Sequence, residues 1–591
     1  MLYKEKKVSL AAKAGVAVLL IVVSSCVDHD YDLGKDIDMT IQVGGEEFTI
    51  PSSSTDRLLL SQILNLDESS SIKPVETEGQ YGLSVGDYVL VQDGSSAPSS
   101  FEIEPVTLSD INTSECVLEL PTFVGGGSGR ITVAAPPSVN SVEISDNNVT
   151  TDIVRLDEAV TDMEILYRLG FQSVNYNGNL YINRGYTIEF GPELEVEIVP
   201  GASSDVLELA DAHTLRFKKD CEVSSAHPLE VNFRIKHIDF GLMPEGQGIY
   251  EPGKFRLESE IKSYGDVSIE SSGITSGTTA NVALGTTSVV RAASIDAVTG
   301  IVNPEINIES TSFAINGIPD FLKEPGNCLD IENPRIVLEI TNTSGVAINI
   351  NGLLTARESD GTTHSAGVGS VYGTDEVVVA PNATTRIMVS RIATPTDGYV
   401  NIVQPKLGEL LLTIPEEIVF GDIDAKAVQQ PAVIELGRSY DFGTDYKAII
   451  PLAFGPDMTL HYTETEADWG EDLSQYSFKR VEARVVAINS IPMDLKPTVQ
   501  ALDNKGEIIN DVQAEVEGVV AAGTLASPSN SELLIKIQSN SSNIGRLDGV
   551  LLTFDGASSA QHLGVNLNKE QSIVFSDIRL TVYGGVTIDL N

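Results

Sequence analysis

Five aspartates lie within eleven residues shortly after a cysteine, and carboxylates at such spacing can coordinate calcium. They are Asp28, Asp30, Asp32, Asp36 and Asp38, in the stretch CVDHDYDLGKDID. An EF-hand loop needs oxygen ligands at positions 1, 3 and 5, glycine at position 6 and glutamate at position 12. Counted from Asp28, the first three positions fit, but position 6 is Leu33 and position 12 is Met39. The segment therefore does not predict a calcium loop, and we expect no metal there.

The stretch 440–478 is both aromatic and acidic, a combination that can bind sugars. It holds the only tryptophan, Trp469, and several tyrosines, Tyr440, Tyr446, Tyr462 and Tyr476. Ring faces can stack on the apolar faces of sugars, while carboxylates accept hydrogen bonds from sugar hydroxyls. Alternatively, the rings cap a sandwich core with their polar ends in water. The candidate ligand-binding residues are therefore Trp469, Tyr462, Tyr476 and Tyr446, and both interpretations stay open.

Other motifs that could carry chemistry fail on spacing or context. GGGSGR (125–130) and GVGSVYG (367–373) resemble phosphate loops, but strand-like segments follow them where a phosphate loop needs a helix. The histidines show no metal-ligand spacing, and neither a G-x-S-x-G elbow nor a local cysteine–histidine signature occurs. A glycosidase carboxylate pair is set by folding and cannot be recognised in the sequence. We expect a protein without catalytic activity, cofactor or metal.

Residues 1–25 predict an export signal that ends at a lipidation site. Lysines precede an apolar core at 14–23, which is about half the roughly 20 residues needed to span a bilayer. The sequence VSSC, ending at Cys26, resembles the lipobox of bacterial lipoproteins, whose cysteine carries acyl chains such as palmitate and anchors the protein to a membrane. A simple secretory signal with an unrelated cysteine is the alternative. The acidic tether that follows resembles the surface-export signal of Bacteroidota lipoproteins.

Composition predicts a folded, acidic protein of several domains. The chain has 591 residues, a formal net charge of −46 and 42% hydrophobic residues, and single cores rarely grow past about 250 residues. Because such a charge repels polyanions, we expect no nucleic-acid partner. Besides Cys26 there are Cys116, Cys221 and Cys328. Their spacing shows no metal motif, and whether any two of them form a disulfide stays open.

Alternating apolar and polar residues, broken by glycine and proline, predict short strands along almost the whole chain. Asn177-Gly178 lies between two alternating runs and predicts a β-hairpin. Helix candidates are few: 54–66 and 318–324 are short, and 156–169 is ambiguous between helix and strand. The pattern predicts an all-β chain of tandem β-sandwiches, of immunoglobulin-like or Greek-key type, after a lipoprotein signal peptide.

An approximate repeat indicates two related sandwiches in the carboxy-terminal half. Residues 340–361 and 487–506 each begin with a strand that ends in asparagine, Asn342 or Asn489, and continue through an alternating strand to a tight turn. We expect the amide to bond its own backbone where the chain crosses between sheets. The predicted divisions are a signal peptide (1–25), a lipidated cysteine and acidic tether (26–45), a β domain (46–165) and β-sandwich domains at 166–300, 301–415 and 416–591.

Several segments resemble a family of large outer-membrane surface lipoproteins of the Bacteroidales (Bacteroidota). They are YDLGKDIDMTIQVGGEEFTIPSSST (31–55), INGIPDFLKEPGNCLDIENPRIVLEITN (315–342), SIPMDLKPTVQALDNKG (490–506) and GGVTIDLN (584–591). The resemblance implies an all-β surface protein and carries no functional residue across.

We therefore expect a lipid-anchored outer-membrane protein, exposed at the cell surface, that binds a ligand or has a structural role without catalysis. A periplasm-facing orientation is the alternative. Two more specific functions stay open: a glycan-binding accessory lipoprotein of a polysaccharide-uptake system, and a fimbrial or adhesin-like subunit. The corresponding partners would be a polysaccharide or other surface proteins.

Overall fold

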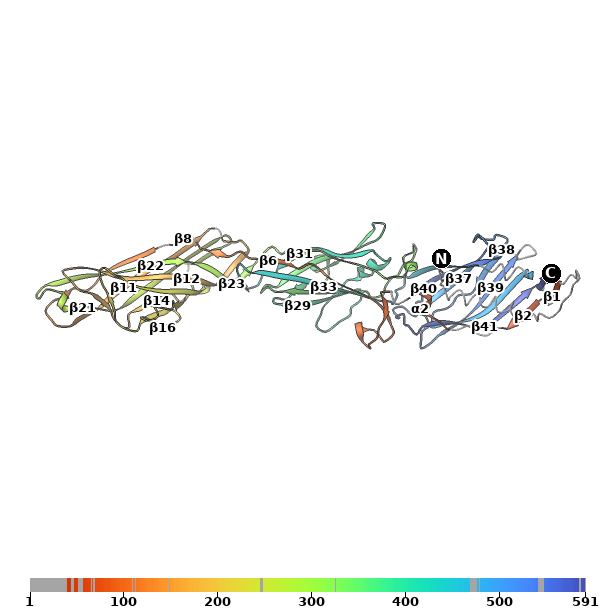
Figure 1. The fold of residues 1–591 in the computed structure, drawn as a ribbon, viewed down its shortest axis with the longest axis horizontal. Coiled ribbons are helices and arrows are strands. Elements are labelled where there is room, and N and C mark those ends of the chain that lie inside the picture. The colour runs from red at the N-terminus through yellow and green to blue at the C-terminus, as the bar shows by residue number, and fades with distance from the viewer. Residues whose placement is uncertain are drawn as a thin grey trace, which may run out of the picture.

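The protein is almost entirely β-structure, with 59% of residues in strands and 5% in helix, which confirms the predicted all-β architecture of several sandwiches. Three bodies follow one another along a rod (Figure 1). We call them the distal body (105–302, joined by β32), the middle body (70–104 and 303–458) and the terminal body (40–64 and 459–589). The computed structural model describes residues 40–43, 47–51, 57–64, 66, 70–108, 110–111, 113–147, 149–244, 248–324, 326–467, 476–477, 479–539, 547–583 and 586–589.

The distal body packs two large antiparallel sheets face to face. One has the order β10-β22-β12-β19-β15 with β7, β9, β23 and β32 attached, and the other β16-β17-β14-β21-β11-β8 with β13, β18 and β20 attached. The elements are β7 (Val106–Thr107), β8 (Asp110–Ile111), β9 (Thr113–Glu119), β10 (Phe123–Val124), β11 (Arg130–Asp146), β12 (Ile153–Val174), β13 (Leu180–Ile182), β14 (Thr187–Phe190), β15 (Leu194–Ile198), β16 (Leu207–Asp211), β17 (Thr214–Phe217), β18 (Cys221–Val223), β19 (Leu229–Asp239), η2 (Phe240–Leu242), β20 (Gly248–Glu251), β21 (Lys254–Glu270), η3 (Ser271–Gly273), β22 (Thr279–Ala292), β23 (Ser294–Val302) and β32 (Ala432–Glu435).

The middle body is a second sandwich, with sheets β30-β29-β25-β33-β5-β4 and β24-β31-β26-β27, to which β6 and β28 add. Its elements are β4 (Ile72–Pro74), η1 (Gln80–Gly82), β5 (Tyr88–Ser95), β6 (Ser99–Glu102), β24 (Thr311–Ala314), η4 (Asp320–Lys323), β25 (Arg335–Asn342), β26 (Ile348–Arg357), β27 (Thr363–Val368), η5 (Ser370–Tyr372), β28 (Val377–Val379), β29 (Ala383–Ser390), β30 (Val400–Val403), η6 (Pro405–Leu411), β31 (Glu417–Ala427) and β33 (Ser439–Pro451).

The terminal body repeats this plan with sheets β2-β41-β36-β39-β38 and β34-β40-β37, joined by a small sheet β1-β42-β35. Its elements are β1 (Thr40–Val43), β2 (Glu47–Pro51), β3 (Leu58–Leu59), α2 (Leu60–Ile63), β34 (Thr459–Glu466), β35 (Tyr476–Ser477), β36 (Arg480–Asn489), β37 (Met493–Leu502), β38 (Val512–Glu517), β39 (Ser529–Ser539), β40 (Gly549–Ser558), β41 (Ser572–Tyr583) and β42 (Val586–Asp589). Of the helix candidates, 54–66 gives the single turn α2 and 318–324 gives η4.

The chain runs out along the rod and returns. It begins in the terminal body with β1–β3, crosses the middle body with β4–β6, forms the distal body with β7–β23, and comes back through β24–β33 to β34–β42. The expected domain boundaries do not coincide with the three bodies. The boundary at 165/166 falls inside β12, and the boundary at 300/301 falls inside β23. The boundary at 415/416 separates β31 from β26, although the two strands pair in the middle body. Pairings such as β5 with β33 join segments hundreds of residues apart, and no local composition marks them.

Strict alternation explains why these residues form strands, because every second side chain of a strand faces the core. In β21, residues 255, 257, 259, 261 and 263 are buried while 254, 256, 260 and 262 are exposed. The ambiguous stretch 156–169 lies within β12 and is strand throughout, although its burial alternates only from 159 to 165 and is interrupted on either side. With 22 residues at about 3.3 Å each, β12 spans about 70 Å, and the long strands of the distal body lie along the rod (Figure 1).

The asparagine repeat is confirmed by the geometry of the two chain crossings. Asn342 ends β25 in one sheet of the middle body, and its Nδ2 donates to the carbonyls of Val346 (2.8 Å) and Ala380 (3.2 Å). Its Oδ1 accepts the backbone N–H of Ser344 at 2.9 Å. The next strand, β26, belongs to the opposite sheet. Where the chain passes from one sheet to the other, its backbone N–H and C=O groups have no partner in a neighbouring strand, and the asparagine side chain supplies these hydrogen bonds instead.

Asn489 does the same between β36 and β37 of the terminal body. Its Nδ2 lies 2.9 Å from the Ala521 carbonyl, 3.2 Å from that of Ile491 and 3.3 Å from that of Met493, while Oδ1 accepts the Ile491 N–H at 2.8 Å. Both asparagines are fully buried, at 1% and 0% exposure. The strand orders around them also match, since β25 pairs with β29 and β33 as β36 pairs with β39 and β41. The two bodies are therefore related sandwiches.

The three bodies are joined by strand pairing and by a shared core. At the distal junction β23 pairs with β32, and β33 begins four residues later, where Tyr440 lies against Phe101 with ring centroids 5.6 Å apart. One hydrophobic cluster extends through all three bodies, from Leu60 to Ile573. The molecule is therefore a rod whose bodies pack directly against one another, and not a set of separate domains joined by flexible linkers.

An ion pair with a buried carboxylate lies in the middle body, beside its junction with the terminal body. Asp330, whose side chain is 2% exposed, accepts a hydrogen bond from Nη1 of Arg391 at 2.7 Å through Oδ1. Its Oδ2 accepts the backbone N–H of Asp457 at 2.9 Å, at the start of the chain's return to the terminal body. The carboxylate therefore fixes the middle-body segment from which the chain enters β34 of the terminal body.

Candidate functional site

The aromatic set predicted around Trp469 does not form one platform. Tyr446 is 8% exposed in β33 of the middle body, where it stacks on Phe313 and its hydroxyl donates to the Ser312 carbonyl at 2.9 Å. Tyr446 is therefore a core residue, and its assignment to a ligand site is wrong. Tyr462 is half-buried in β34 of the terminal body. Trp469 and the side chain of Tyr476 lie outside the described residues.

The lipidation site Cys26 and the aspartates that follow it also lie outside the described residues. The remaining cysteines, Cys116, Cys221 and Cys328, are all free thiols, which answers the open question about a disulfide. Burial raises the pKa of Cys221, so its thiol is poorly nucleophilic. No group of three or more metal-ligating side chains comes together within the described part of the chain.

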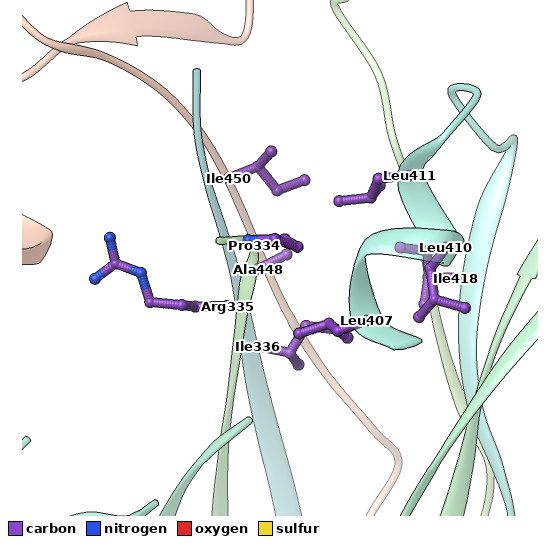
Figure 2. A pocket seen from close by; sticks show the side chains of 9 residues that line it. All are labelled: Pro334, Arg335, Ile336, Leu407, Leu410, Leu411, Ile418, Ala448 and Ile450. Atoms are coloured by element: carbon purple, nitrogen blue, oxygen red, sulfur yellow. The ribbon is translucent and has the colours of Figure 1, made fainter. Parts of the chain in front are cut away.

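Three voids among the described residues are packing gaps and not ligand pockets. One of about 10 Å³ lies between the sheets of the middle body, lined by Ile336, Leu407 and other aliphatic residues (Figure 2). The guanidinium of Arg335 points away from it (Figure 2) and donates to the Tyr81 carbonyl at 2.6 Å. Two further gaps of about 20 and 30 Å³ are lined by apolar residues at the junction with the terminal body. Gaps of this size hold at most about one water molecule.

A cluster of loops closes the end of the distal body that lies away from the middle body. The strand pairing shows which end this is. β23 pairs with β32 next to the middle body, and Ile153 at the start of β12 pairs with Val302 of β23. β12 then runs away from the middle body and ends at Val174, where it pairs with β22. Loops 125–129, 175–179 and 271–278 lie at that end. We call them the tip loops. Loops at the end of a sandwich often carry binding residues.

Tyr176 holds the tip loops together. Its hydroxyl donates to the Asn179 carbonyl at 2.7 Å and accepts the Glu270 N–H at 3.1 Å, and its ring is 6% exposed. The predicted hairpin at Asn177-Gly178 is wrong, because β12 and β13 belong to different sheets and the segment is a crossing loop. Burial of the Tyr176 ring between the sheets redirects the chain there.

The glycine-rich segment 125–129 is also fastened. The Gly125 N–H donates to the Thr278 carbonyl at 3.0 Å, and the Ser271 N–H donates to the Gly129 carbonyl at 2.9 Å. Gly126 and Gly129 have φ values of 141° and 104°, which favour glycine. As predicted, this segment and 367–373 are turns and loops between strands, not phosphate loops.

An exposed apolar patch with a polar rim lies on the outer face of the distal body. At its centre is Tyr264 of β21, 39% exposed, and beside it are Pro136 and Pro137 of β11, both exposed, and Val139, 45% exposed. We call Pro136, Pro137, Val139 and Tyr264 the tyrosine–proline patch. Its rim includes Lys262 on the same strand, and Glu189 and Arg216 on β14 and β17.

A β-bulge forms this patch. β11 and β21 pair regularly up to Ala135 with Gly265 and resume at Ser138 with Ser263, so Pro136 and Pro137 together oppose Tyr264. Proline lacks the N–H that a ladder needs and is tolerated at bulges. Gly265, at φ 143°, allows the local twist and packs against Tyr186, where a Cβ would lie 2.8 Å from the Tyr186 backbone. Bulges re-aim side chains, and here the bulge turns three apolar rings to solvent.

Hydrogen bonding fixes the tyrosine ring in this patch. The Tyr264 hydroxyl donates to Oε2 of Glu189 at 2.7 Å, an interaction that raises the pKa of Tyr264. Thr187 lies between Tyr264 and Arg216 in the cross-strand row and is 5% exposed beneath them. No sequence motif marks this patch, although alternation in ESEIKSY places Tyr264 on the same face as the exposed residues Glu260 and Lys262.

The comparisons with known proteins leave the family undetermined. No protein-family model and no curated protein matches the chain. Among solved structures, a "putative secreted protein" of Parabacteroides distasonis matches 49% of this chain and 90% of its own at 15% identity, with a TM-score of 0.34. The structure titled PfGH50B matches 27% of this chain and 22% of its own at 12% identity, with a TM-score of 0.14. At these scores neither likeness carries an argument about function.

Proposed function

We propose that this protein is a lipid-anchored surface rod that presents its distal body to a partner and has no catalytic activity. One observation carries the proposal: the segment nearest the predicted anchor and the tip loops lie at opposite ends of the molecule. β2 pairs with residues 579–583 of β41, whereas β3 pairs with Ile573 and Ser572. Leu567 and Asn568, which precede β41 in the chain, contact the middle body at Tyr88 and Asp87. The start of β41, where β3 pairs, therefore lies near the middle body, and the end of β41, where β2 pairs, lies away from it.

The amino-terminal segment therefore runs from the outer end of the rod toward the middle body. β1, which precedes it, pairs with β42 at that outer end (Figure 1). A chain anchored through Cys26 would leave the membrane at this end and hold the tip loops as far away as the rod allows. The net charge of −46 supports this orientation, because it keeps the rod from lying on an anionic surface.

The fimbrial alternative gains less support from the geometry. β2 is an edge strand, so its removal would uncover β41. The first arginine after it, Arg57, is however fastened, since its Nε donates to the Ser572 hydroxyl at 2.6 Å and its guanidinium also bonds the Glu570 carbonyl. A trypsin-like cut at this position would have to displace both contacts.

The test is antibody labelling of intact cells that express the chain with a short epitope inserted after Gly127. Labelling without permeabilisation supports surface display, and labelling only after the outer membrane is opened contradicts it. A Cys26→Ala variant of the same chain should lose membrane association. If the unaltered chain is found free of membranes, or the variant stays membrane-bound, lipid anchoring is contradicted.

A further inference from the structure

We propose that the tyrosine–proline patch binds a neutral polysaccharide. The inference rests on the proposed function in one respect, since only a displayed distal body would meet such a polymer. The patch has the two kinds of surface that a sugar ring needs. Tyr264, Pro136 and Pro137 offer flat apolar faces for the C–H face of the ring, and the rim offers polar groups for its hydroxyls.

The patch is organised before any ligand arrives. The Tyr264 ring is held by its 2.7 Å hydrogen bond to Glu189, and the proline rings have no side-chain rotamers to lose. The strand that carries Tyr264 belongs to the interior of a sheet, because β21 pairs with β11 on one side and with β14 on the other. Binding therefore orders little of the protein, which favours affinity from a small contact area.

The rim matches hydroxyl groups in type and position. Lys262 and Arg216 supply donors, and Glu189, with one oxygen already bonded to Tyr264, supplies an acceptor. Tyr264 and Arg216 lie two strands apart across Thr187, about 9.5 Å at the usual strand spacing. A disaccharide unit can cover that distance, so one sugar can stack on Tyr264 while the next meets Arg216.

Charge and size favour a neutral sugar over other partners. Carboxylates surround the patch, with Asp266 on the same strand and Glu208 and Asp211 on β16, three strands from β21, and the whole chain carries −46. A polyanion would be repelled. A stable protein interface buries about 800 Å² per partner around an apolar centre, and four apolar residues on a flat sheet face are a small centre for that.

Affinity gel electrophoresis with soluble neutral polysaccharides tests the proposal, with mannan, starch, xylan and β-glucan as probes and the chain from residue 27 onward as the protein. We expect at least one probe to retard the unaltered protein. Tyr264→Ala should weaken that retardation at least about fivefold, which corresponds to the lower end (about 1 kcal/mol) of what stacking on one aromatic side chain contributes in nucleic-acid complexes, and we take sugar stacking as comparable. Tyr264 is exposed, so the substitution should leave the fold intact, which circular dichroism checks.

Tyr372→Ala is the matched control, because Tyr372 is 41% exposed on η5 of the middle body, far from the patch in sequence and in another sheet system. It should bind like the unaltered protein. Absence of retardation by every neutral probe, equal retardation of Tyr264→Ala, or retardation only by an anionic polymer would each overturn the proposal. These outcomes do not depend on surface display, which the intact-cell labelling measures separately.

Discussion

Replacing Asn489 by alanine should destabilise the terminal body and leave the distal body unchanged. The substitution leaves the buried N–H of Ile491 without the oxygen that lies 2.8 Å away, and it removes the amide donor from the Ala521 and Met493 carbonyls. An unsatisfied buried group costs about 1–3 kcal/mol and each lost hydrogen bond about 0.5–1.5 kcal/mol. The free energy of unfolding should therefore fall by about 2–5 kcal/mol.

Differential scanning calorimetry and hydrogen exchange followed by mass spectrometry would measure this effect. For a body of about 150 residues, such a loss lowers the transition temperature by roughly 10 °C. Peptides from β36–β41 should exchange faster, while those from β11, β12 and β21 should not change. Asn489→Asp keeps the shape but loses the donors, so it should destabilise at least as much as Asn489→Ala.

Asn504→Ala, in the exposed turn after β37, is the control and should change the free energy of unfolding by less than about 0.5 kcal/mol. The reasoning is refuted if Asn489→Ala costs under about 1 kcal/mol, or if protection is lost equally in the distal body. Either result would mean that the buried amide does not hold the crossing between the two sheets.

Three further perturbations test the packing and the electrostatics. Asp330→Ala leaves Arg391 without its buried partner and should cost about 3–5 kcal/mol, with exchange rising in the middle-body segments around Arg391 and Asp457 beside the junction; unchanged exchange there would refute its role. Gly523→Ala would place a Cβ 2.1 Å from the Asn489 carbonyl oxygen and should lower the yield of folded protein, whereas Gly506→Ala meets open space, and the strain of its positive φ should cost only about 1 kcal/mol. Burial acts to raise the pKa of Glu482, but hydrogen bonds from Arg480 and Tyr583 outweigh burial and hold the pKa below its usual value. The ionised Glu482 side chain therefore stabilises the fold above the pKa of the unfolded state, near 4.3. This stabilisation is lost as the pH falls through the lower pKa of the folded state. Acid titrations of Glu482→Gln should show a smaller loss of stability over that window, and an unchanged titration would contradict this account.

The strands and the asparagine crossings could be predicted because their signals are local. Alternation marks β21 and β33, and the repeated strand–asparagine–strand scheme marks Asn342 and Asn489. The same alternation also carries information about single residues. In SYDFGTDY, Tyr440, Phe442 and Tyr446 share one face and all are buried, while Asp441 and Asp445 face solvent. Period two in β33 was therefore enough to assign Tyr446 to the core.

The arrangement of the bodies could not be read in this way. β5 pairs with β33, and β2 pairs with β41, although hundreds of residues separate the two strands of each pair. The sequence of a short strand does not indicate which distant strand it pairs with. Likewise, the tyrosine–proline patch depends on a bulge that sets Pro136 and Pro137 opposite Tyr264. Each strand alone shows an exposed residue, and only the register brings these residues together.

One chain runs out and back to form a rod, with β1 and β42 at one end and the tip loops at the other. Small-angle X-ray scattering from the chain beginning at residue 27 tests this arrangement most directly. Strands β12, β33 and β41, taken end to end, give a length of about 150 Å and a radius of gyration of about 45 Å. A compact globule of 591 residues would have a radius of gyration of about 25 Å. A value near 45 Å with a rod-like distance distribution is predicted, and a value near 25 Å would contradict the account.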